Sequence, residues 1–136
     1  MKNLLLLLIS AALIFASACK KDTQSERFLL LTGNIWKTDS LFAGGIDASG
    51  PGQLLEKFKG DIKFNEDGSG YFGQYIGTWR FVYDETSIVL ESVDLPVPLT
   101  AFIAELKTSS LKMTTSYPNA VEPSNPLAIR MTFKPK

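Results

Sequence analysis

Cys19 is the only cysteine in this chain of 136 residues, and its position indicates which chemistry its thiol undergoes. The preceding segment, MKNLLLLLISAALIFASA, has one cation, Lys2, then an apolar run from Leu4 to Phe15, and then small residues. This order is typical of a secretory signal peptide. Cleavage after residues 1–18 makes Cys19 the new N-terminus, so the sequence predicts an exported protein whose first residue is available for covalent modification.

Two other interpretations of the N-terminal segment remain open. A transmembrane helix needs about 20 apolar residues, whereas this run is broken at Ser17 and soon followed by charged residues from Lys20 to Asp22. An ordinary signal peptide cut after Ala18 leaves Cys19 as a free thiol with no partner in an oxidising compartment. We therefore favour covalent modification of Cys19 over both.

The tetrapeptide Ala16-Ser17-Ala18-Cys19 resembles the lipobox of bacterial lipoproteins, with Ala16 where that family usually has a larger aliphatic residue. The sequence Cys-Lys-Lys-Asp that starts at Cys19 is similar to that of Bacteroidetes lipoproteins. The resemblance implies lipidation of Cys19 with acyl chains such as palmitate, and a location in the cell envelope, at the outer membrane. Two or more acyl chains anchor a protein stably in a membrane, because each buried methylene contributes about 0.8 kcal/mol. The periplasmic and surface faces both stay open.

The composition excludes several classes of enzyme. The chain contains no histidine, which removes Ser-His and Cys-His nucleophile pairs and histidine-ligated metal sites. Once Cys19 is lipidated, no thiolate remains. The carboxylates in or beside the predicted strands show no spacing that pairs two of them for acid–base chemistry. We therefore predict a protein that is not an enzyme and has no cofactor, no catalytic residue and no metal site.

The charge balance bears on the partners of the protein. Lys and Arg together number 14, as do Asp and Glu, and no basic patch interrupts this balance, so we expect no nucleic-acid partner.

Beyond the signal peptide, the sequence predicts a polar tether over residues 19–27 and one domain over residues 28–136. A domain of this size buries enough surface to fold without a disulfide or a metal.

The predicted domain consists of short segments in which apolar and polar residues alternate, separated by Gly, Pro, Asn and Asp. This pattern is expected for antiparallel strands with one face on a core. The eight predicted strands are Ile35–Phe42, Gly60–Phe64, Gly70–Ile76, Gly77–Tyr83, Ser87–Val93, Leu99–Leu106, Ser110–Tyr117 and Leu127–Lys134. The segment QLLEKF predicts a short helical turn between the first two strands. We expect an all-β fold, an eight-stranded antiparallel up-and-down barrel, although a two-sheet sandwich stays open.

Three segments resemble lipocalin-like lipoproteins of Bacteroidetes: LTGNIW at Leu31–Trp36, IKFNEDGSG at Ile62–Gly70, and GTWRF at Gly77–Phe81. The first resembles the Gly-x-Trp motif of lipocalins, with one more residue between the glycine and the tryptophan. In that family a late arginine packs on this tryptophan, and Arg130 and Arg80 are the candidates here. The resemblance implies a lipocalin-like barrel that binds a small apolar or amphipathic ligand.

The large aromatic side chains of the predicted strands are the candidates to line a ligand pocket. They are Trp36, Phe64, Phe72, Trp79, Phe81 and Phe133. The alternative is that they fill the barrel, because an eight-stranded barrel is just wide enough either to be packed or to hold one small ligand. A filled barrel predicts a different function, a non-catalytic module that docks onto another envelope protein through its outer face or through the loops Ala43–Phe58 and Pro118–Pro126.

Overall fold

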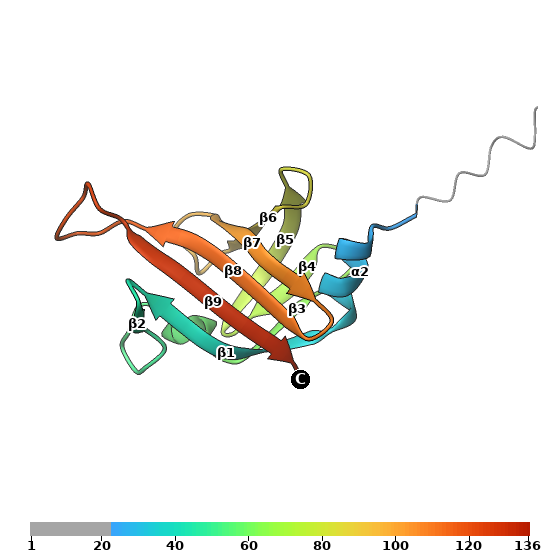
Figure 1. Ribbon diagram of the computed structural model, residues 1–136, viewed down its shortest axis with the longest axis horizontal. Helices are drawn as coiled ribbons and strands as arrows, with labels where there is room; N and C mark the ends of the chain where they lie inside the picture. The colour runs from blue at the N-terminus through green and yellow to red at the C-terminus, as the bar shows by residue number, and fades with distance from the viewer. Residues whose placement is uncertain (1–22) are drawn as a thin grey trace, which may run out of the picture.

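The structure is a computed structural model that describes residues 23–136 (Figure 1). Cys19 and the predicted signal peptide, residues 1–18, lie outside the described residues. The described chain forms one antiparallel sheet that closes on itself, because β1 (Ile35–Ala43) pairs with both β3 (Asp61–Phe64) and β9 (Leu127–Pro135). Eight strands make the wall of this barrel, so the predicted all-β barrel is confirmed and the two-sheet sandwich is excluded.

The wall strands follow one another around the barrel in chain order, which is the up-and-down arrangement predicted from the sequence. Between β3 and β9 they are β4 (Ser69–Phe72), β5 (Tyr75–Val82), β6 (Ser87–Ser92), β7 (Leu99–Lys107) and β8 (Ser110–Tyr117). An extra strand of two residues, β2 (Ile46–Asp47), pairs only with β1. Apart from the β4–β5 boundary, the predicted strands agree with the observed ones to within one residue.

The boundary between β4 and β5 was predicted wrongly, between Ile76 and Gly77. The turn lies instead at Gly73, whose φ of 62° is a left-handed conformation that favours glycine. A Cβ atom on Gly73 would also lie 2.3 Å from the carbonyl oxygen of Lys57. Gly77 lies within β5, paired with Ser92, so the two glycines looked alike in the sequence but have different structural roles.

The helix α2 (Glu26–Gly33) is the element that the strand pattern did not predict. Its N-terminus is capped by Ser25, whose hydroxyl accepts a hydrogen bond from the backbone N–H of Phe28. The same hydroxyl lies within hydrogen-bonding distance of both carboxylate oxygens of Glu85, 2.8 and 2.7 Å away. Arg27 donates from Nε to the carbonyl oxygen of Glu85 at 3.0 Å. Ser25 and Arg27, assigned to the tether in the sequence analysis, thus contact the turn between β5 and β6.

The long connection between β1 and β3 folds back onto the barrel. It contains a three-residue 3-10 turn, η1 (Glu56–Phe58). The backbone N–H of Gln74 donates to the carbonyl oxygen of Lys57 at 2.8 Å, which ties η1 to the β4–β5 turn. Leu55 and Phe58 are only 5% and 7% exposed, so this connection contributes to the core even though it holds several glycines.

Candidate functional site

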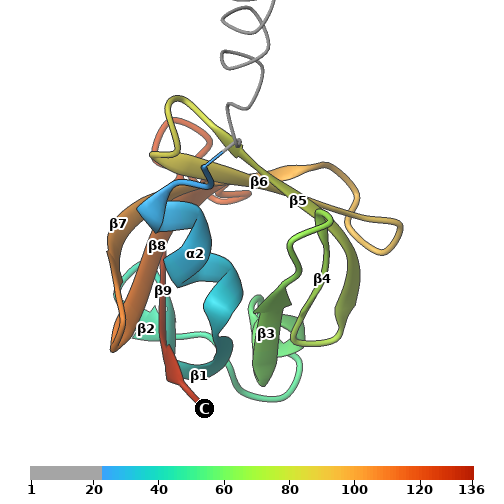
Figure 2. The same ribbon diagram turned by 90° about the vertical axis from the view of Figure 1, so that its right-hand side faces the viewer.

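The two ends of the barrel are covered differently. Viewed along the barrel, α2 lies across one end, inside the ring of strands (Figure 2). The opposite end carries β2 and the connection between β8 and β9, which project away from α2 (Figure 1). We call the first the helix end and the second the open end.

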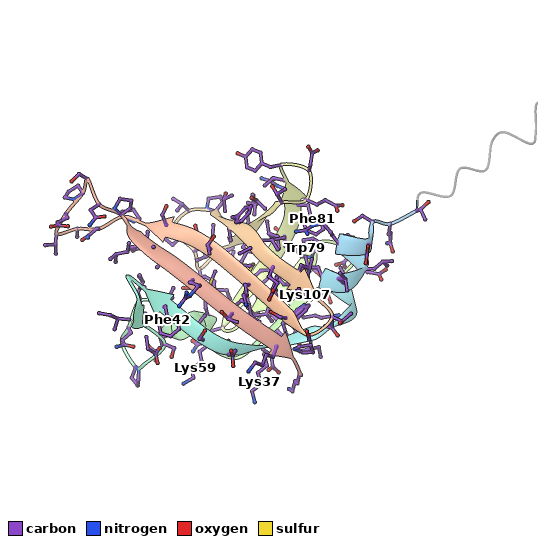
Figure 3. All side chains as sticks on the ribbon, in the orientation of Figure 1. Lys37, Phe42, Lys59, Trp79, Phe81 and Lys107 are labelled. Atoms are coloured by element: carbon purple, nitrogen blue, oxygen red, sulfur yellow. The ribbon has the colours of Figure 1, made fainter. Side chains whose placement is uncertain are left out.

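The helix end is filled by aromatic rings that pack around Trp79. The ring centroids of Phe64 and Phe81 lie 5.5 and 5.4 Å from that of Trp79, both in edge-to-face geometry. Phe28 of α2 contacts the same indole at 5.7 Å. Figure 3 shows Trp79 and Phe81 on the part of β5 that approaches α2. Edge-to-face pairs at these distances are the favoured arrangement of aromatic rings, so this end is a packed core.

Both indole N–H groups of the helix end have backbone partners. Trp36 donates from Nε1 to the carbonyl oxygen of Leu31, the residue of α2 that is fully buried, at 3.0 Å. Trp79 donates to the carbonyl oxygen of Asn65 at 2.9 Å. Lys63 donates to the carbonyl oxygens of Thr32 and Asn34, next to the C-terminus of α2. These bonds fix the helix and the two indoles in one arrangement, with both indole N–H groups bonded within the protein.

The six aromatic residues predicted to line a ligand pocket belong to this packed interior. Trp36, Phe64, Phe72 and Phe133 are 0% exposed, Trp79 is 6% exposed and Phe81 is half-buried. None of the six lines the cavity described below. The structure therefore places them together as core residues, which is the arrangement that the sequence analysis gave as the alternative.

Neither candidate arginine packs in the interior on Trp36. Arg130 is exposed and stacks over the ring of Phe42, with its guanidinium carbon 5.2 Å from the ring centroid. Arg80 is also exposed and forms an ion pair with Glu91 at 3.5 Å. The cation that reaches the C-terminal end of α2 is Lys63, through its bonds to Thr32 and Asn34.

The open end contains a cavity of about 570 Å³. Its floor is the buried pair Ile129 and Met131 of β9, which are 3% and 1% exposed. One wall is formed by Leu55 and Phe58, from the connection between β1 and β3. The other walls come from the starts of β5 and β7, the end of β8, and the connection between β6 and β7, with Leu95, Pro96, Val97, Pro98 and Leu99. The lining is therefore predominantly apolar.

Three polar side chains occupy inward-facing positions around this cavity: Tyr75 on β5 and Thr115 and Tyr117 on β8. The ring of Tyr75 packs on Phe58 with a centroid separation of 4.7 Å. Burial, assisted by the negative charge of Asp94 and by Tyr117, raises the pKa of Tyr75 above its ordinary value. The phenol of Tyr75 therefore stays protonated, as a hydrogen-bond donor, throughout the neutral pH range.

Sequence reasoning missed the residues of the cavity because most lie in connections or at strand ends. A signal for them exists: Leu54-Leu55 and the segment from Leu95 to Leu99 carry aliphatic side chains inside regions rich in glycine and proline. Of these residues, Leu55 is buried and Leu95 packs against the core, whereas Leu54 and Val97 stay exposed. All four line the cavity at the open end of the barrel.

A search against protein-family models and against curated proteins finds no significant match to this sequence. Within residues 23–136, no helix is long and apolar enough to cross a bilayer. The same residues contain no group of three or more acidic, cysteine or histidine side chains arranged to hold a metal ion.

Proposed function

We propose that this protein binds a small apolar or amphipathic molecule in the cavity at the open end of a lipocalin-like barrel. The observation that carries the proposal is the cavity itself, with its volume of about 570 Å³ and its predominantly aliphatic and aromatic lining. Pockets that bind small molecules typically measure about 300–1,000 Å³ and are lined mainly by apolar side chains with a few polar groups.

We further propose that lipidation of Cys19 holds the barrel at a membrane of the cell envelope. The sequence of residues 1–19 supports this anchor. The position of α2 supports an orientation: Ser25 is attached to the helix end, and the chain from Lys20 to Gln24 spans at most about 20 Å. The helix end then faces the bilayer, and the open end points away from it.

The proposal is for a binding protein rather than an enzyme. The lining of the cavity offers hydroxyl groups but no carboxylate, amine or guanidinium. General acid–base or nucleophilic catalysis in such a pocket would have to rely on Tyr, Ser and Thr hydroxyls alone, and no base adjoins them in the lining.

The direct test is to fill the cavity and follow binding of N-phenyl-1-naphthylamine, a neutral dye that fluoresces in apolar surroundings. Trp79 and Trp36 lie at the helix end, so intrinsic tryptophan fluorescence is a poor reporter of this site. In Thr115→Trp the indole occupies the cavity, and we expect at least a tenfold loss of dye affinity. Thr108→Trp places the same side chain in the exposed turn between β7 and β8, outside the cavity lining, and should bind the dye like the native protein.

Circular dichroism of both variants establishes that they fold. The proposal is overturned if the native protein does not bind the dye, or if a folded Thr115→Trp binds it unchanged.

A second candidate function is a docking module of the cell envelope, and one observation favours it. Ile76, Val93 and Val97 are 75%, 97% and 68% exposed and line a groove of about 430 Å³ on the outer wall beside the open end. An apolar surface of this kind also suits a protein partner. A native protein that binds no dye, and that loses a cross-linked envelope partner in Val93→Asp, would favour this function over ligand binding.

The anchor has its own test. Metabolic labelling with palmitate in a bacterial host that processes lipoproteins should label the native chain and leave Cys19→Ser unlabelled. A native chain that takes up no label would overturn lipid anchoring.

A further inference from the structure

The cavity lining carries no charged side chain. Its residues are aliphatic, aromatic or hydroxyl-bearing, and prolines complete the connection between β6 and β7. Moving an ionised group from water into such a site is unfavourable unless an opposite charge pairs with it there. The lining therefore discriminates against ligands that carry their charge into the cavity.

The hydroxyl groups of the lining favour a particular kind of polar group. Thr115 donates from Oγ1 to the carbonyl oxygen of Thr100 at 2.7 Å, so its own donor is used within the protein. The phenol hydroxyls of Tyr75 and Tyr117 have no hydrogen-bond partner among residues 23–136. A phenol hydroxyl can donate one hydrogen bond to an oxygen acceptor. Two free donors around an apolar cavity match a ligand with a hydrogen-bond acceptor.

Two groups of opposite charge lie near Tyr75, outside the cavity lining. Lys57 places its Nζ 6.0 Å from the centroid of the Tyr75 ring, and Asp94 is close enough to influence the pKa of the same tyrosine. A carboxylate head group would be attracted by Lys57 and repelled by Asp94. An ammonium head group would be repelled by Lys57 and attracted by Asp94. Since one cation and one anion lie near Tyr75, we assign the selectivity to the uncharged lining.

We propose that the ligand is an electrically neutral amphiphile, with an apolar body in the cavity and an uncharged oxygen acceptor, such as an alcohol, ester or amide, bonded to Tyr75 and Tyr117. This inference rests on the proposed function and specifies its ligand class. It distinguishes the protein from a carrier of free fatty acids, whose carboxylate would need a cation in the lining.

The experiment compares three ligands that share one chain and differ in head group. Displacement of N-phenyl-1-naphthylamine is measured with 1-decanol, decanoate and decylammonium at pH 8, where they are neutral, anionic and cationic. We expect 1-decanol to compete at least tenfold more strongly than either ion. Equal or stronger competition by decanoate or decylammonium would overturn the selectivity, while dye binding itself would still support the cavity as a binding site.

The two phenols are tested by Tyr75→Phe and Tyr117→Phe, which keep the rings and remove the hydroxyls. Each is expected to weaken 1-decanol binding by about two- to tenfold, the usual net value of one hydrogen bond. Affinity for the dye, which has no oxygen acceptor, should be unchanged. Tyr83→Phe is the matched control, because Tyr83 is 75% exposed in the turn between β5 and β6, at the helix end.

The outcomes separate the two proposals. Loss of 1-decanol affinity with the dye retained supports the acceptor bonds. Unchanged 1-decanol affinity in the Tyr75→Phe, Tyr117→Phe double variant would overturn the role of the phenols. Failure of the native protein to bind the dye overturns the proposed function, whatever the head-group series shows.

Discussion

The helix end and the open end are built from the same eight strands, yet one is solid and the other holds a cavity. At the helix end, α2 inserts Phe28 and Leu31 above the aromatic side chains of the strands. At the open end the covering segments are connections containing several prolines, and their aliphatic side chains line a space without filling it. The width of the barrel therefore does not decide whether it is hollow. The segment that covers each end does.

The ends also differ in how their polar groups are used. The indoles of Trp36 and Trp79 donate to backbone carbonyls, and Lys63 reaches the C-terminal end of α2. At the open end, the hydroxyls of Tyr75 and Tyr117 have no hydrogen-bond partner within the described part of the chain. Satisfied polar groups favour one rigid arrangement, whereas unused donors beside an apolar space are suited to a ligand.

The largest expected difference between the two ends is in stability. Trp36→Ala removes a fully buried indole from the helix end and should lower the free energy of unfolding by about 3–5 kcal/mol. Tyr117→Ala removes an aromatic side chain that is 48% exposed at the open end and should cost about 1 kcal/mol or less. Urea denaturation of both variants checks this. Equal losses would show that the two ends are packed alike.

A smaller effect is expected at the N-terminus of α2. Ser25→Ala removes the helix cap and the contacts with Glu85, and should cost about 1 kcal/mol. Hydrogen exchange of the α2 amides should accelerate, while exchange in β8 and β9 stays close to the native rate. Ser109→Ala, in the exposed turn between β7 and β8, is the matched control. If both variants behave alike, Ser25 does not hold the helix on the barrel.

The smallest expected effect is a pH dependence on the outer wall. A hydrogen bond from Ser110, with Lys107 and Lys112 nearby, lowers the pKa of Glu105 from 4.5 to about 2. Because the folded pKa lies below the unfolded one, the contribution of this carboxylate is fully present above pH 4.5 and is lost as the pH falls toward 2.

Glu105→Gln should therefore be slightly less stable than the native protein at pH 7, and the difference should shrink through that window. Thermal melts of both proteins at several pH values measure this. A difference that stays constant down to pH 2.5 would contradict the assignment. Binding of a neutral ligand at the open end should not change with this titration, since Glu105 is absent from the cavity lining.

The strands were predictable because their signal is local. In β8, Leu111 and Met113 are buried and Lys112 is exposed, and this alternation is legible in a few consecutive residues. The turn at Asn65–Gly68 could likewise be predicted from consecutive residues. By contrast, α2 has only eight residues, too few to be stable alone, and it forms because the end of the barrel buries Leu31 and Phe28. This burial is a tertiary contact, so it cannot be predicted from the eight residues of α2 alone.

Local patterns in the sequence predicted the strands of the barrel, and the residues next to Cys19 predicted an anchor there. The pairing order of the strands, which the sequence left open between a barrel and a sandwich, came from the tertiary structure. So did the difference between the solid end and the hollow end. Tyr75, Tyr117 and Ile129 are far apart in sequence and line one cavity because the sheet closes and brings β5, β8 and β9 around it. Alternation places a side chain inside the barrel, but whether it meets another side chain or empty space depends on contacts between distant segments.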